Sequence, residues 1–235
     1  MGGCVIKLNS DDIYYIYNMF VEPYHKQLGK YEDFFWWLQN YNNKKWNWEG
    51  KDFPRVIALL EFASYVKKYN LVSKKVLTFN GIHDPELEYL PHNSGVDYLY
   101  DKRTEENDLH IWNPPIHDFD FCLLNQTLEH VYDPILCLQN IHTHLLPNSY
   151  IWITTPTISI PHQTPLHYYS YTPTGLGAVI MSAGLKIVEC GWWGNREYLD
   201  KLLNIGWIDY TNLCIEPLKN DPRFSVITWV LAKKI

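Results

Sequence analysis

The sequence predicts an α/β protein whose mostly parallel sheet follows a helical N-terminal extension. From about residue 71 onward, short runs of strand-forming residues alternate with helical patterns, which is the order that builds a parallel sheet. The run Phe119–Leu124 passes directly into polar residues, as parallel strands do at the ligand-binding carboxyl edge of a sheet. The 235 residues suffice for one such domain. We expect a helical extension or cap over residues 1–70 and an α/β domain over residues 71–235.

Composition excludes several classes of protein. The formal net charge of −6 argues against a nucleic-acid partner, since such proteins usually carry a basic face. The five cysteines are scattered without a CxxC pair, so neither a disulfide framework nor a zinc or other metal site is expected. No apolar run approaches the roughly 18 residues of a membrane span. These observations predict a cytoplasmic protein without a nucleic-acid or membrane partner.

Three helices are expected in the extension. Ser10 and the two following acids form a helix start, and this helix ends near Phe20. A second, aromatic-rich helix is predicted over Tyr24–Tyr41, and Pro54 suits the first position of a third. These helices either pack on the sheet or contact the substrate.

Seven strands are expected in the α/β domain. Asp133 is a predicted cap for a helix beginning at Pro134, and Thr172 opens another helix that Gly184 ends. The predicted strands are Val76–Phe79, Val96–Tyr100, Leu109–Trp112, Phe119–Leu124, Tyr150–Thr155, Leu185–Gly191 and Phe224–Ala232.

Several motifs appear in a characteristic order and spacing. The block Phe119–Pro134 reads FDFCLLNQTLEHVYDP, and LLPNSYIWITTP and then TPTGLGAVIMSAGLKIVE follow it. From Lys74 onward this order resembles the class I S-adenosylmethionine-dependent methyltransferases, in particular the small-molecule, type 11-like branch with a Leu-Glu-His motif. The resemblance implies a Rossmann-like seven-stranded sheet of six parallel strands and a last antiparallel one, flanked by helices. It also implies S-adenosyl-L-methionine as cofactor.

The resemblance places cofactor-binding residues at the strand ends. Asn80 and Gly81 stand near the methionine part and Asp101 at the ribose hydroxyls. Asn113 stands where the adenine amino group is bound, while Asn125 and Gln126 line the methionine side.

The loop after the first strand departs from the family pattern. The family has Asp-x-Gly-x-Gly there, and this chain has Thr78-Phe79-Asn80-Gly81-Ile82, whose extra Cβ atoms restrict close approach of a ligand. This departure supports an alternative hypothesis, a catalytically inactive methyltransferase-fold protein that serves as a binding or scaffold subunit.

A loop rich in histidine and tyrosine follows the predicted strand Tyr150–Thr155. Because methyl transfer to a hydroxyl requires removal of a proton, and histidine is the usual base near neutral pH, His162 or His167 is the predicted catalytic base. The acceptor is predicted to be a sugar or nucleotide sugar. The predicted substrate-binding residues are His130, Tyr168, Tyr169, Trp192, Trp193 and Asn195. For the two tryptophans, packing in the core is an equally good explanation. For His130, a structural role at the start of a helix is equally good.

A third hypothesis concerns Asn113-Pro114-Pro115. These residues resemble the Asn-Pro-Pro-aromatic motif of amino-group methyltransferases, so the third hypothesis is transfer to an amino group. Two features differ from that family: Ile116 replaces the aromatic residue, and the motif precedes the predicted strand Phe119–Leu124 instead of following it.

Overall fold

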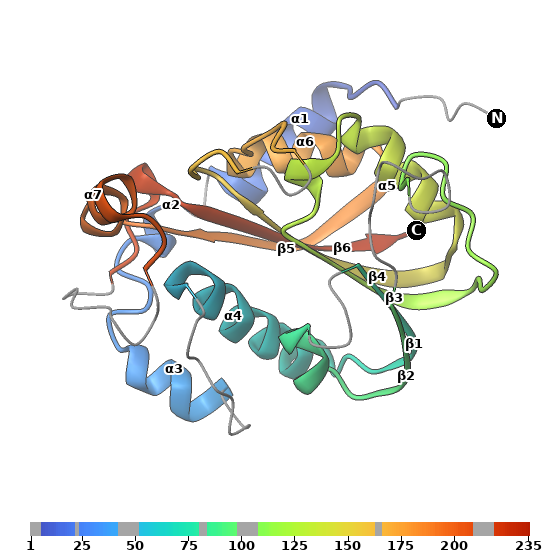
Figure 1. The fold of residues 1–235 in the computed structure, drawn as a ribbon, viewed down its shortest axis with the longest axis horizontal. Helices are drawn as coiled ribbons and strands as arrows, with labels where there is room; N and C mark the ends of the chain where they lie inside the picture. Colours follow the sequence, from blue (N-terminus) through green and yellow to red (C-terminus); the bar gives the residue numbers. More distant parts are fainter. Residues whose placement is uncertain are drawn as a thin grey trace.

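The computed structural model describes residues 6–21, 24–41, 52–79, 84–97, 108–162, 166–208 and 219–235. A single mixed sheet has the strand order β2-β1-β3-β4-β6-β5 (Figure 1). Neighbouring strands are parallel except β6, which is antiparallel to both β4 and β5. The Rossmann-like α/β fold is therefore confirmed. The strands are β1 (Ser73–Thr78), β2 (His92–Asp97), β3 (Phe119–Asn125), β4 (Leu145–Pro156), β5 (Leu185–Trp193) and β6 (Ile227–Lys234).

Helices cover both faces of this sheet. Helices α1, α5 and α6 lie on one face and α3 and α4 on the other (Figure 1), so the buried residues form two cores, one on each side. The α-helices are α1 (Ser10–Phe20), α2 (Tyr24–Gln27), α3 (Phe34–Tyr41), α4 (Phe53–Tyr69), α5 (Pro134–Thr143), α6 (Pro173–Ser182) and α7 (Arg196–Ile205). Short 3-10 helices are η1 (Pro85–Glu88), η3 (Leu128–His130) and η5 (Pro222–Phe224). The division at residue 70 stays a prediction.

The described residues contain six strands rather than seven, because the predicted strand Leu109–Trp112 is a turn. The Asp108 carboxylate accepts a hydrogen bond from the backbone N–H of His110 at 3.0 Å, and the Asp108 carbonyl accepts one from Ile111 at 3.0 Å. These local bonds use donors that a sheet ladder needs. Leu109 and Trp112 are buried all the same. The apolar residues were therefore correctly expected in the core, but in the wrong backbone conformation.

The predicted helix Tyr24–Tyr41 is interrupted. Gly29 and Tyr31 have φ angles of +73° and +78°, which no α-helix accommodates, so α2 and α3 are separate. Tyr31 is held in this conformation by its surroundings, since its buried hydroxyl donates to Glu61 Oε1 at 2.5 Å. By contrast, the helix starts at Asp133 and Thr172 are confirmed, because both side chains accept N-cap hydrogen bonds.

The strand order creates a switch point at the centre of the sheet. The chain leaves β1 for β2 on one side and then crosses to β3 on the other side of β1. Ligands of open α/β sheets bind at the carboxyl ends of strands beside such a point. Among the described residues, no helix combines the length and apolar composition needed to cross a membrane.

Gly194, just after β5, is a sensitive packing position. A Cβ atom there would lie 1.9 Å from the carbonyl oxygen of Phe224 and 2.7 Å from the backbone N of Val226. Because both are backbone atoms, Gly194→Ala forces the chain before β6 to shift, and we expect a loss of about 1–3 kcal/mol or more in unfolding free energy. Urea denaturation measures this loss. An unchanged midpoint would show that the β5 and η5 segments lie further apart.

Candidate active site

A cavity of about 410 Å³ lies beyond the carboxyl ends of β3 and β4. Its volume is within the range of about 300–1,000 Å³ that is typical of small-molecule sites. The walls come from the start of α4, the turn after β3, the loop after β4 and the region around α7 and β6. Side chains at the wall include Arg55, Gln126, Glu129, His130, His162 and Trp207.

The turn after β3 supplies three of these wall residues, Gln126, Glu129 and His130. Gln126 has a φ angle of +48° and ends the strand, while its backbone N–H donates to the carbonyl of Thr154 at 2.9 Å. The chain then forms η3, a short helical turn in which Glu129 and His130 are consecutive and both buried. The Leu-Glu-His motif thus forms part of the cavity wall.

The loop after β4 folds back onto this turn. The backbone N–H of Tyr168 donates to the carbonyl of Glu129 at 2.7 Å, and His130 Nδ1 lies 2.8 Å from the carbonyl of Leu166. These two contacts join segments that are more than 30 residues apart in the sequence. They bring His162 against His130.

Three histidines form a row beside the cavity. His162 Nε2 lies 3.2 Å from His130 Nε2, and His167 Nδ1 lies 3.3 Å from His162 Nδ1. His162 and His130 reach the cavity wall, while His167 lies behind His162 and does not line it. Burial lowers the pKa of both His130 and His167, which favours neutral imidazoles near pH 7.

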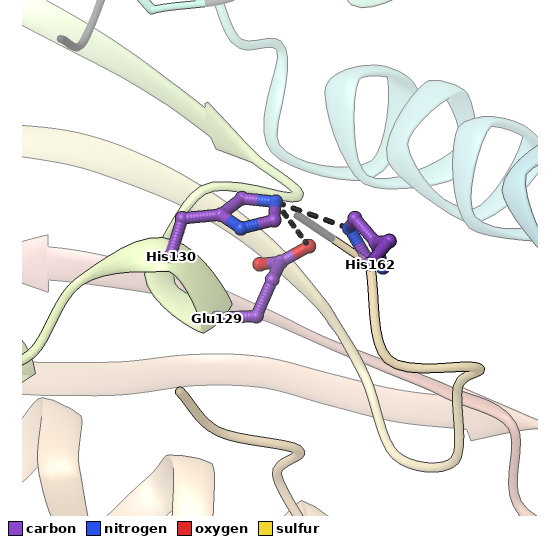
Figure 2. Close-up of side chains that lie close together, drawn as sticks. All are labelled: Glu129, His130 and His162. Carbon is purple, nitrogen blue, oxygen red and sulfur yellow. Dashed lines mark hydrogen bonds and ion pairs between the residues drawn. The ribbon is translucent and has the colours of Figure 1, made fainter. Parts of the chain in front are cut away.

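Glu129 lies beside this row. Its side chain is 1% exposed, and neither carboxylate oxygen has a hydrogen-bond partner among the described residues. Its Oε1 lies 3.9 Å from His130 Nε2 (Figure 2). Burial raises the pKa of Glu129 to about 8. The sequence motif contains this residue, but nothing in its spacing pointed to a partner in the loop after β4.

A second buried polar group adjoins the cavity. Arg55, in the first turn of α4, donates to both carboxylate oxygens of Glu86 and, at 3.2 Å, to Asp84. Burial and the nearby Glu86 raise the pKa of Asp84. Burial opposes ionisation of Glu86 as well, but Arg55 outweighs it and lowers the Glu86 pKa. The charge of Arg55 is therefore balanced mainly by Glu86.

The predicted cofactor residues fall into three groups. Asn80, Gly81 and Asp101 lie outside the described residues. Asn125 is buried, and its amide donates to both oxygens of Asp84 at 2.9 Å, so it does not present this amide to a ligand. Asn113 is exposed and absent from the cavity lining, whereas Gln126 reaches the cavity.

The other predicted substrate residues mostly have structural positions. Trp192 and Trp193 are 3% and 0% exposed and belong to the two cores, so their burial favours packing over substrate contact. Asn195 caps α7 by accepting from the N–H of Tyr198 at 2.8 Å. Tyr168 and Tyr169 are exposed outside the cavity lining, which contains His130.

Comparisons with known proteins place this chain in a family. A sequence profile described as methyltransferase domain matches residues 36–204, well over half of the chain. No curated protein sequence matches it significantly. Among solved structures, it is similar to the [4+2]-cyclase SpnF, with 11% identity, 87% of this chain and 93% of that chain covered, and a TM-score of 0.49. It is also similar to an S-adenosylmethionine-dependent methyltransferase from Mesorhizobium loti, with 14% identity, coverage of 75% and 98%, and a TM-score of 0.48. On the profile match, the chain belongs to the methyltransferase domain family.

Proposed function

We propose that the protein methylates a hydroxyl group of a small molecule of the sugar or nucleotide-sugar class. The observation that carries this proposal is the position of His162 and His130 at the wall of a ligand-sized cavity beyond β3 and β4. A hydroxyl acceptor must lose its proton during transfer, and a neutral imidazole at the cavity wall is suited to accept it. In this proposal His162 is the base, and His167 holds the His162 ring in place through the contact between their Nδ1 atoms.

The cavity wall favours a hydroxyl over an amine as acceptor. Amino-group transfer through Asn113-Pro114-Pro115 requires Asn113 at the acceptor, but Asn113 is exposed and outside the cavity lining. An uncharged amine also carries its own lone pair and has less need of two adjacent imidazoles. This arrangement supports the hydroxyl hypothesis over the amino-group one.

The mixture of side chains at the wall supports a sugar as acceptor. Trp207 offers exposed aromatic surface, while Gln126 and Ser159 offer polar groups that can form hydrogen bonds. Small-molecule sites combine apolar surface with a few placed polar groups in this way. We also infer a cytoplasmic location, because the described cysteines Cys122, Cys137 and Cys190 are free thiols.

The described part of the fold fits the methyl donor of the family in its strand arrangement. Strand β3 borders the switch point, and Gln126, which follows β3, lines the cavity. When bound, S-adenosylmethionine supplies an electrophilic methyl group. We propose that Gln126 holds it together with Asn80, Gly81 and Asp101, while Asn125 acts indirectly by holding Asp84 in place.

Two measurements test this proposal. Calorimetric titration with S-adenosylmethionine and S-adenosylhomocysteine should show binding, which Asp101→Ala abolishes for the most part. Transfer of a labelled methyl group to a panel of nucleotide sugars and to matched amino sugars should label hydroxyls. Absence of cofactor binding would support the alternative of an inactive binding protein. Label found only on amino groups would contradict the hydroxyl acceptor.

A further inference from the structure

Three metal-ligating side chains converge at the cavity wall. One ligand atom from each of Glu129, His130 and His162 lies within 4.8 Å of the others (Figure 2). Two come from the η3 turn and one from the loop after β4, and all three residues line the cavity. The sequence predicted no metal site, because that expectation depended on cysteine spacing, and no cysteine takes part.

Backbone contacts determine which ring nitrogens carry protons. His130 Nδ1 lies 2.8 Å from the carbonyl of Leu166, so we assign its proton to Nδ1. His167 Nε2 lies 2.8 Å from the carbonyl of Tyr169, which leaves His167 Nδ1 as an acceptor. His162 Nδ1 then donates, since it faces that acceptor at 3.3 Å and the carbonyl of Ile160 at 3.1 Å. Both His130 and His162 therefore present an Nε2 lone pair.

This assignment places like groups against each other. The two Nε2 lone pairs face each other at 3.2 Å, and the carboxylate of Glu129, without a hydrogen-bond partner among the described residues, lies beside them. Neutral acceptors at this separation repel, and a buried carboxyl group without a hydrogen-bond partner is unfavourable in either protonation state. A cation between the three groups would replace the repulsion between the two lone pairs and give the carboxyl group of Glu129 a partner.

The donor set and its spacing suit a particular class of cation. We propose that Glu129, His130 and His162 bind one divalent transition-metal ion, such as Zn²⁺, through a carboxylate oxygen and the two Nε2 atoms. Imidazole nitrogens suit Zn²⁺, Co²⁺ or Fe²⁺, whereas Mg²⁺ and Ca²⁺ prefer oxygen ligands. Two nitrogens about 2.0–2.1 Å from a tetrahedral ion are roughly 3.3 Å apart, close to the 3.2 Å observed. The carbonyls of Leu166 and Ile160 orient the two rings, as the surroundings of metal-ligating histidines usually do.

Three protein ligands leave at least one coordination position open toward the cavity. Such open positions distinguish catalytic metal sites from structural ones. This part of the inference rests on the proposed function: the open position is suited to the oxygen of an acceptor hydroxyl, whose pKa the ion lowers. In that form the Nε2 lone pair of His162 binds the ion, and the hydroxyl proton leaves to solvent rather than to His162.

Metal binding is testable without any activity. Untagged protein is stripped with chelator, dialysed, and titrated by calorimetry with Zn²⁺ and, by visible absorption, with Co²⁺. We expect one ion per chain, with a Co²⁺ spectrum that indicates nitrogen and oxygen ligands. Glu129→Gln, which keeps the shape of the buried side chain, and His162→Ala should each weaken binding by at least about 10–100-fold. His167→Ala is the matched control, since His167 contacts His162 without being a ligand. The metal affinity of this variant should fall less than that of Glu129→Gln or His162→Ala.

Several outcomes separate this inference from the proposed function. Failure of the wild-type protein to bind either ion, or equal affinity in Glu129→Gln, His162→Ala and wild type, would overturn the metal site. Circular dichroism of each variant excludes unfolding as the cause of lost binding. Stoichiometric binding without methyl transfer to any hydroxyl would leave the site intact and contradict the proposed acceptor. Methyl transfer to a hydroxyl by protein that binds neither ion would support the proposed acceptor and contradict the metal site.

Discussion

Arg55→Met is expected to lower the unfolding free energy by about 3–5 kcal/mol, the usual cost of removing one partner from a buried ion pair. Arg55 neutralises Glu86, which is fully buried, and also donates to Asp84, which is 3% exposed. Without the guanidinium, Glu86 keeps the indole N–H of Trp152, 3.2 Å away, and a hydrogen bond with Asp84, and neither partner carries a positive charge. Denaturation in urea, followed by fluorescence, measures the loss.

Two further variants show whether this loss comes from charge. Arg196→Met removes an exposed arginine that lies 3.7 Å from Asp200 one helical turn away, and it should cost no more than about 0.5 kcal/mol. Adding Glu86→Gln to Arg55→Met should recover much of the stability, because no unpaired buried charge then remains. A loss below about 1 kcal/mol in Arg55→Met would show that Glu86 is not ionised in the folded protein.

His162→Ala is expected to reduce the rate of methyl transfer by about 10²–10⁴-fold, the typical contribution of a positioned acid–base group. His162 lines the cavity and contacts His130 at 3.2 Å, so its loss removes a group at the acceptor hydroxyl, whether it accepts the proton directly or binds an ion. The measurement is kcat/KM for the best hydroxyl acceptor found in the transfer assay.

His167→Ala is the comparison for this prediction. His167 lies 3.3 Å from His162 but outside the cavity lining, so its removal should cost less than removal of His162. Cofactor affinity should be unchanged in both variants. A larger effect for His167→Ala than for His162→Ala would mean that the loop after β4 turns a different face to the acceptor.

Most of the fold follows from local patterns in the sequence. Buried strands contain short continuous apolar runs, such as Phe121–Leu124 in β3 and Ile151–Ile153 in β4, and helix starts such as Asp133 carry a capping side chain, so each is visible within a few residues. The errors occurred where local and tertiary preferences disagree. Leu109–Trp112 has strand-forming residues, but Asp108 bonds their backbone into a turn, and Tyr31 takes a left-handed conformation inside an apparently helical run.

The candidate site could be located from the sequence but not assembled from it. The Leu-Glu-His motif and the histidine-rich loop were both expected near the carboxyl edge of the sheet, and both line or adjoin the cavity. Their mutual contact depends on backbone hydrogen bonds such as Tyr168 to Glu129, and any residue except proline can make such a bond. No side-chain pattern in the sequence therefore predicts this contact between the two segments.

The sequence by itself determined the order of strands and helices, the family and the two segments that carry the polar site, because propensity, capping and apolar runs act over short distances. Only the tertiary structure decided what those segments do together. It committed Asn125 to Asp84 and packed Trp192 and Trp193 into the cores. It also brought Glu129 within reach of His130 and His162, because burial and the meeting of distant side chains depend on how the whole chain packs.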